Sequence, residues 1–137
     1  MIKTTLAVLS VVLGVLAVSV GLAPSASAAI EDCSQGSYVS NGVTLVSCIY
    51  VDLDNGRAQA RLLFNSQATF AVYDVYITIQ RSGTSATNYC QIAFFPSDGT
   101  ATRVCNAYAS NPPGPQAWRA DSNVNGVLAS SKIISDS

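Results

Sequence analysis

The chain has 137 residues, of which 49% are hydrophobic and only 11% are charged, and it contains no histidine. Its seven basic and eight acidic side chains are scattered without runs and leave a formal net charge of −1. Nucleic acids and anionic membranes attract clustered Lys and Arg, so neither is expected as a partner. The lack of histidine excludes Ser-His-Asp and Cys-His catalysis.

The first 28 residues have the pattern of a secretory signal peptide. Lys3 supplies a positive start, residues 6–22 are almost unbroken apolar, and residues 26–28 form an A-x-A cleavage site. The alternative is a transmembrane anchor, but the apolar run is short for about 20 spanning residues and no Lys or Arg cluster follows it. We therefore expect a secreted protein without a membrane anchor, in which residues 29–137 form a single domain.

Four cysteines in a short exported chain predict two disulfides, for which three pairings are possible. Cys33 and Cys48 have the same spacing as Cys90 and Cys105, and each pair encloses a turn signal. We therefore favour Cys33–Cys48 and Cys90–Cys105, each joining the two strands of a β-hairpin. In the first hairpin, a turn around residues 40–42 requires a β-bulge. A zinc site is not expected, because the chain has neither histidine nor close C-x-x-C pairs.

The clearest hairpin is predicted between residues 43 and 64. Apolar residues alternate along both halves of this segment. A two-residue turn at Asn55-Gly56 pairs Leu53 with Ala58, which brings the two apolar faces together. On the solvent side, the same register pairs Tyr50 with Arg61 and Asp52 with Gln59, and it brings Asp54 next to Arg57 at the turn.

Residues 52–56 also have the acidic and amide pattern of a calcium loop. The closing glutamate of such a loop is absent, so a turn is the preferred interpretation. No metal or cofactor is expected anywhere in the chain.

Further strands follow along the chain. Residues 73–81 alternate, with Tyr73, Val75, Ile77 and Ile79 predicted inward and Asp74, Tyr76, Thr78 and Gln80 outward. Residues 88–95 and 100–109 are predicted to form the second disulfide-linked hairpin, although its register places Arg103 beside the apolar Ile92. Strands are also expected within 116–120 and 127–134. These elements predict an all-β fold, a single small antiparallel β-sandwich of Ig-like type with about seven strands.

A proline-rich loop occupies residues 110–116. Pro112, Pro113 and Pro115 remove backbone donors and restrict φ, so this segment is stiff and is neither strand nor helix. The preferred interpretation is a connection from one sheet to the other. The alternative is an exposed inhibitory loop, since rigidity reduces the entropy lost when a loop enters an enzyme cleft.

Aromatic residues are the other candidates for binding. Tyr50 and Tyr76 point outward by alternation and Trp118 follows the proline loop, and the hypothesis of a polysaccharide or cell-wall binder predicts that these three form one exposed patch. The remaining candidate positions, Tyr38, Tyr73, Tyr89 and Tyr108, are expected in the core or at corners of the sandwich.

Catalysis by paired carboxylates would have to use two of Asp52, Asp54 and Asp74. Such a site needs apolar enclosure to raise the pKa of its acid, and these residues lie at a turn or on outward positions. The sequence therefore predicts a secreted, non-enzymatic binding protein for an extracellular glycan or the cell wall. The alternative is an inhibitor that acts on a secreted protease or glycosidase through residues 110–116.

Overall fold

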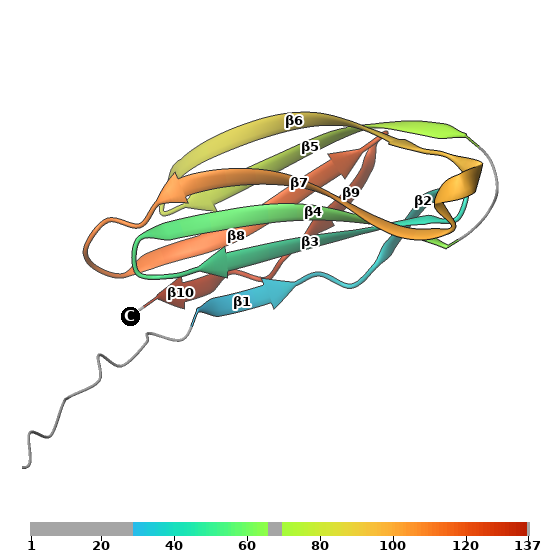
Figure 1. Cartoon of the computed structure of the whole chain (residues 1–137). Coiled ribbons are helices and arrows are strands. Elements are labelled where there is room, and N and C mark those ends of the chain that lie inside the picture. The colour runs from blue at the N-terminus through green and yellow to red at the C-terminus, as the bar shows by residue number, and fades with distance from the viewer. Residues whose placement is uncertain (1–28, 66–69, 137) are drawn as a thin grey trace, which may run out of the picture.

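The computed structural model describes residues 29–65 and 70–136, which form two antiparallel sheets packed face to face (Figure 1). Sheet A has the order β1-β3-β4-β7, with β2 also paired to β3; its strands are β1 (Ile30–Cys33), β2 (Ser37–Ser40), β3 (Val43–Val51), β4 (Asn55–Asn65) and β7 (Thr100–Ser110). Sheet B has the order β10-β8-β5-β6, with β9 also paired to β8; its strands are β5 (Ala71–Arg81), β6 (Thr84–Phe94), β8 (Gln116–Val124), β9 (Val127–Ser130) and β10 (Ile134–Asp136).

The predicted β-sandwich is therefore confirmed. The structure has ten strands in its described part where about seven were expected, because four short strands of three or four residues flank six long ones. Within residues 29–65 and 70–136, no helix is long and apolar enough to span a membrane. The proposed signal peptide, residues 1–28, lies outside the described residues.

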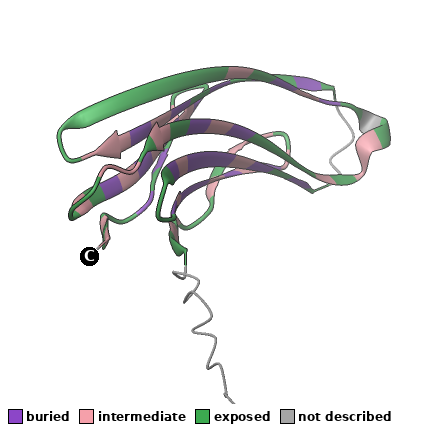
Figure 2. Ribbon diagram, turned by 60° about the vertical axis from the view of Figure 1, so that its left-hand side comes forward, coloured by how far each residue is buried: buried purple, intermediate pink, exposed green. Residues whose placement is uncertain are grey.

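The core lies between the two sheets and follows the two-residue period of the strands. Along β5, buried and exposed residues alternate from Ala71 to Val75 and beyond, as predicted, and β8 alternates beside it, whereas the edge strand β6 is exposed over most of its length (Figure 2). Aromatic rings fill one part of this core: Phe64 and Phe94 stack with their centroids 4.9 Å apart, and Tyr73 meets Phe94 edge-on at 6.0 Å. Such dense apolar contact between inner faces is what holds a sandwich together.

The hairpin of β3 and β4 forms, but its predicted register is wrong. Ala58 lies opposite Ile49 instead of Leu53, a shift of four positions along β3. Because the shift is even, the same residues still face the core. Leu53 is the exception: it lies at the hairpin tip and is 69% exposed. The tip is held by Asp52, whose Oδ1 accepts hydrogen bonds from the backbone N–H groups of Asp54 (2.9 Å) and Asn55 (2.7 Å).

Gly56 explains why the Asn-Gly turn does not form. This glycine is buried inside β4 and lacks the positive φ that a type I′ turn requires. The indole ring of Trp118 packs directly on it, and a Cβ at this position would lie 2.7 Å from Cε3 of that ring. Gly56 is therefore required for the close approach of the ring and not for a turn.

The first predicted disulfide, Cys33–Cys48, is confirmed. The two residues lie directly opposite each other on β1 and β3, with their Cα atoms 4.0 Å apart. The predicted bulge is also present, because the register of β2 against β3 shifts between Tyr38 and Ser40.

The second disulfide, Cys90–Cys105, is confirmed as a pairing, but the hairpin predicted around it is wrong. β6 belongs to sheet B and β7 to sheet A, so the bond joins the two sheets, with the Cα atoms 5.9 Å apart. A short 3₁₀-helix, Pro96–Asp98, carries the chain from one sheet to the other. Arg103 therefore does not pair with Ile92: it lies opposite Leu62 on β4, and its guanidinium group forms a 3.5 Å ion pair with Asp98.

Candidate functional site

The predicted patch of Tyr50, Tyr76 and Trp118 does not exist. Trp118 is completely buried, and its Nε1 donates to Oδ2 of Asp136 at 3.2 Å, so its prediction as a surface residue is wrong. Tyr50 lies on the outer face of sheet A and Tyr76 on the outer face of sheet B, which are opposite sides of the molecule. The physical reason is that alternation gives the face of a strand but not the sheet to which the strand belongs.

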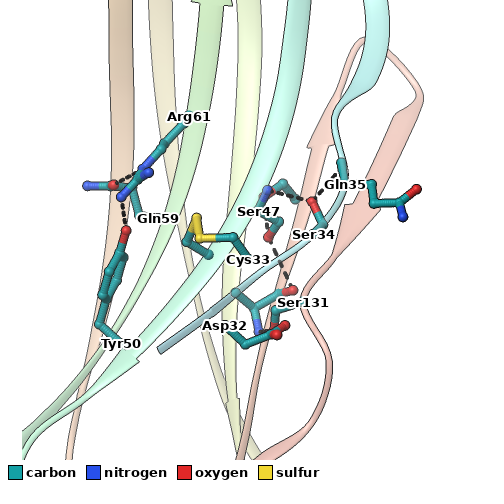
Figure 3. The surroundings of a disulfide bond; sticks show 12 residues. Asp32, Cys33, Ser34, Gln35, Ser47, Tyr50, Gln59, Arg61 and Ser131 are labelled. Atoms are coloured by element: carbon teal, nitrogen blue, oxygen red, sulfur yellow. Dashed lines mark hydrogen bonds between the residues drawn. A yellow bond between two sulfur atoms is a disulfide. The ribbon is translucent and has the colours of Figure 1, made fainter. Parts of the chain in front are cut away.

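Tyr50 is covered by two arginines from the neighbouring strand. The guanidinium carbon of Arg57 lies 4.6 Å from the centroid of the Tyr50 ring, and that of Arg61 lies 5.6 Å from it. Nη2 of Arg61 also donates to the Tyr50 hydroxyl (Figure 3). This ring is therefore engaged by cations and is not free to stack on a sugar.

Tyr76, by contrast, lies beside a second exposed tyrosine. Tyr76 and Tyr89 are directly opposite each other on β5 and β6, their ring centroids are 5.1 Å apart, and each residue is 48% exposed. The register is set by the two-residue turn Ser82-Gly83, in which both residues have positive φ. Counting outward from that turn would have paired the two tyrosines, so the sequence carried a signal that the prediction of Tyr89 as a core or corner residue missed.

Polar side chains surround this pair. The Tyr89 hydroxyl donates to Oδ1 of Asp74 at 2.6 Å, and Nε2 of Gln91 donates to the same oxygen at 3.4 Å. On the other side, Asn123 of β8 lies opposite Tyr76. We call this surface the tyrosine platform, and it consists of Asp74, Tyr76, Tyr89, Gln91 and Asn123.

The charge of Asp74 affects its neighbour. The hydrogen bond to Asp74, together with desolvation, raises the pKa of Tyr89 above its ordinary value of 10.0, because ionising the phenol would place a second negative charge beside the carboxylate. The phenol of Tyr89 therefore stays protonated across the physiological range.

The other expected tyrosines divide between core and surface. Tyr73 is buried as predicted, and its hydroxyl donates to the carbonyl oxygen of Ser40 at 3.1 Å. Tyr38 and Tyr108 are exposed on the outer face of sheet A, so their prediction as core or corner residues is wrong. Both lie on strands whose opposite face already fills the core, so their side chains point to solvent.

The carboxylates considered for catalysis are not assembled into one site. Asp52 and Asp54 lie at the tip of the hairpin in sheet A, whereas Asp74 lies on β5 of sheet B. In the part of the chain that the structure describes, no three Cys, Asp or Glu side chains gather to hold a metal ion.

The proline-rich loop connects β7 of sheet A to β8 of sheet B, as its preferred interpretation predicted. Its start is fixed by hydrogen bonds: Asn111 donates from its backbone N–H to the carbonyl of Asp54 and from Nδ2 to the carbonyl of Asp52, both at 2.9 Å. The loop extends past the ends of the strands (Figure 1). Pro112 is partly buried and Pro113 is exposed, and both line a cavity of about 550 Å³ shared with the hairpin tip.

No protein-family model matches the chain, and no curated protein matches it significantly. The two disulfides indicate an extracellular or otherwise oxidising compartment. Because a sandwich fold supports many unrelated activities, function has to be argued from the exposed side chains themselves.

Proposed function

We propose that the protein is a secreted, non-enzymatic carbohydrate-binding module that contacts its ligand through the tyrosine platform. The observation that carries this proposal is the pair Tyr76 and Tyr89, two half-exposed rings side by side on a regular sheet. Removal of residues 1–28 as a signal peptide would release the module outside the cell, where polysaccharides are the abundant polymers.

The chemistry of the platform suits a sugar. A tyrosine ring offers a flat apolar surface for the C–H face of a pyranose, and its hydroxyl remains available for hydrogen bonding. Asp74, Gln91 and Asn123 place acceptors and donors beside the rings, where the equatorial hydroxyls of a bound sugar would lie. Because the rings project from paired strands of one sheet, little conformational entropy is lost when a ligand orders them.

A pull-down with insoluble cell-wall fractions and purified polysaccharides tests this proposal. We expect the oxidised protein to be retained by at least one glycan, and the variant Tyr76→Ala/Tyr89→Ala to lose about tenfold or more in affinity, as hot-spot aromatics do. The matched control is Tyr38→Ala, which removes a tyrosine of sheet A that is 68% exposed and should bind like the wild type. Equal retention of all three proteins would reject the platform as the binding site.

A second candidate is inhibition of an extracellular protease or glycosidase by residues 110–116. It is favoured by the position of the loop beyond the strand ends and by the fixation of its start, where Nη1 of Arg81 donates to the carbonyl of Ser110 at 2.5 Å. Secreted hydrolases of broad specificity should then be inhibited by the wild type and less by Pro112→Ala/Pro113→Ala. A wild type that inhibits none of them ends this alternative.

A further inference from the structure

We propose that the outer face of sheet A carries a second, separate binding site, which takes an anionic glycan. A cavity of about 530 Å³ opens there, and its lining residues are Ala29, Tyr50, Val51, Asp52, Asn55, Arg57 and Tyr108. This cavity and the tyrosine platform lie on opposite outer faces of the sandwich. Binding at one of them can therefore be tested independently of binding at the other.

The pairing of four strands assembles this site. Glu31, Tyr50, Arg57 and Tyr108 form one row across β1, β3, β4 and β7, since each residue lies directly opposite the next. Arg61 is four residues after Arg57 on the same face of β4. Two guanidinium groups thus flank the Tyr50 ring, at 4.6 and 5.6 Å from its centroid.

Neither of these arginines is neutralised by a carboxylate. The ion pairs among the described residues are Arg103–Asp98 and Arg119–Asp121. All eight Asp and Glu of the sequence fall within the described ranges, so no acidic side chain elsewhere pairs with Arg57 or Arg61. In addition, Nε of Arg57 is shielded from solvent and has no hydrogen-bond partner. An unmet buried donor of this kind is costly, so the guanidinium group of Arg57 is not fully satisfied by the protein itself.

One acidic residue, Asp52, lines the cavity, and a second, Glu31, lies in the same row of the sheet. Asp52 is engaged at the hairpin tip, where its Oδ1 accepts two backbone hydrogen bonds. Glu31 is exposed on the edge strand β1, opposite Tyr50. Asp52 is therefore already engaged and Glu31 lies at the β1 end of the row, whereas Arg57 lies between Tyr50 and Tyr108.

The arginine side is held in place before any ligand arrives. Nε of Arg61 donates to Oε1 of Gln59 at 2.7 Å, and Nε2 of Gln59 donates to Oδ1 of Asn106 at 2.9 Å. The Cys33–Cys48 disulfide lies next to this network (Figure 3). Fixed donors of this kind bind with a smaller entropic loss than mobile surface arginines.

The geometry selects a class of ligand. A guanidinium group binds carboxylate or phosphate through two parallel hydrogen bonds, which neutral sugars cannot offer. Tyr108, which is 62% exposed, supplies a flat wall for the ring that carries the anionic group. The ligand is therefore a glycan whose charge is a carboxylate, as in a polyuronate, or a phosphate, as in a phosphodiester-linked wall polymer.

The test is a titration of the isotopically labelled, oxidised protein with three probes: an oligogalacturonate, a glycerol-phosphate oligomer and the neutral galactose oligomer. We expect the Nε–H resonances of Arg57 and Arg61 to move with at least one anionic probe and to stay in place with the neutral one. The anionic probe that binds identifies the source of the charge. Shifts of equal size with the neutral oligomer, or no shift with either anion, would overturn the proposal.

Variants locate the site. Arg57→Gln should reduce affinity for the binding anion by about tenfold or more, because a charge-assisted bidentate contact is lost. Arg119→Gln is the matched control, since it removes an arginine of sheet B that is already paired with Asp121, and it should bind like the wild type. Tyr108→Ala keeps the charge and alters only an exposed side chain, so reduced binding by this variant supports the site even if Arg57→Gln fails to fold. Equal losses in Arg57→Gln and Arg119→Gln would indicate unspecific attraction and reject the site.

Discussion

Replacement of Gly56 by alanine tests the packing of the core most sharply. The added Cβ would lie 2.7 Å from Cε3 of the Trp118 ring, closer than real Cβ contacts allow. The ring cannot swing away easily, because it is fully buried and Nε1 is hydrogen-bonded to Asp136 at 3.2 Å. Overpacking of this kind costs about 1–3 kcal/mol. Alanine also reduces the conformational entropy of the unfolded chain, which offsets about 0.4–1 kcal/mol of this loss.

The difference leads us to expect that Gly56→Ala lowers the free energy of unfolding by about 1.3 kcal/mol, which in a domain of this size lowers Tm by roughly 5–10 °C. Thermal unfolding followed by circular dichroism measures this loss. The fluorescence of Trp118, the single tryptophan of the chain, reports whether the ring has moved.

Two further variants distinguish packing from turn formation. If Gly56 were a turn residue, Gly56→Asn would be tolerated, because asparagine adopts positive φ with little strain. Packing predicts instead that Gly56→Asn is at least as harmful as alanine. In a Trp118→Leu background, Gly56→Ala should cost at least about 1 kcal/mol less than in the wild type, since the two positions are in contact. A cost of Gly56→Ala below about 0.5 kcal/mol would refute the reasoning.

Three other outcomes are expected. Asp136→Asn should destabilise the protein at neutral pH. Burial acts to raise the pKa of the Asp136 carboxyl, but hydrogen bonds from its neighbours outweigh burial and lower the pKa below its ordinary value of 3.8. The ionised carboxylate therefore stabilises the fold above pH 3.8, and this contribution is lost as the pH falls through the folded pKa. The difference from the wild type should vanish as the pH falls through the folded pKa; a difference that grows in acid would contradict this. Cys90→Ala/Cys105→Ala should lower the free energy of unfolding, measured by urea denaturation, by about 3 kcal/mol. A loss below about 1 kcal/mol would show that the disulfide between the sheets contributes little to stability. Ser47→Ala should lower the free energy of unfolding by about 1–3 kcal/mol, because the buried Ser122 hydroxyl loses the oxygen to which it donates at 2.8 Å. Replacing both serines by alanine should be milder, because no hydroxyl is then left without a partner.

Local pattern was sufficient to identify the six long strands and the buried face of β5. Alternation in residues 73–81 identified β5 and its inward residues, because a strand with one buried face has to repeat with period two. Equal cysteine spacing identified both disulfides. The β-sandwich followed from the number of strands and the lack of any helical pattern.

Long-range arrangement was not predictable in the same way. A spacing of fifteen residues fits both a stapled hairpin and a bond between sheets, so Cys90 and Cys105 were assigned to the wrong context. An even shift of register keeps every apolar residue on its face, so pattern alone could not place Ala58 opposite Ile49. The burial of Trp118 depends on Gly56, which is distant in the sequence, and no local signal connects the two.

The candidate site was predicted only in part for the same reason. Tyr76 was expected at the surface and is there, but its partner Tyr89 was assigned to the core or a corner. The row that places Tyr50 between Arg57 and Arg61 depends on the true register of β3 and β4, which the Asn-Gly signal obscured.

The most direct measurement of the proposed function is the response of the tyrosine rings to a neutral oligosaccharide taken from a polysaccharide that retains the protein. With ring-labelled tyrosine, we expect the aromatic signals of Tyr76 and Tyr89 to shift on titration, because sugar stacking changes their ring environment. The signals of Tyr38 and the buried Tyr73 should stay in place. Unchanged signals from Tyr76 and Tyr89 at saturating oligosaccharide would contradict carbohydrate binding by the tyrosine platform.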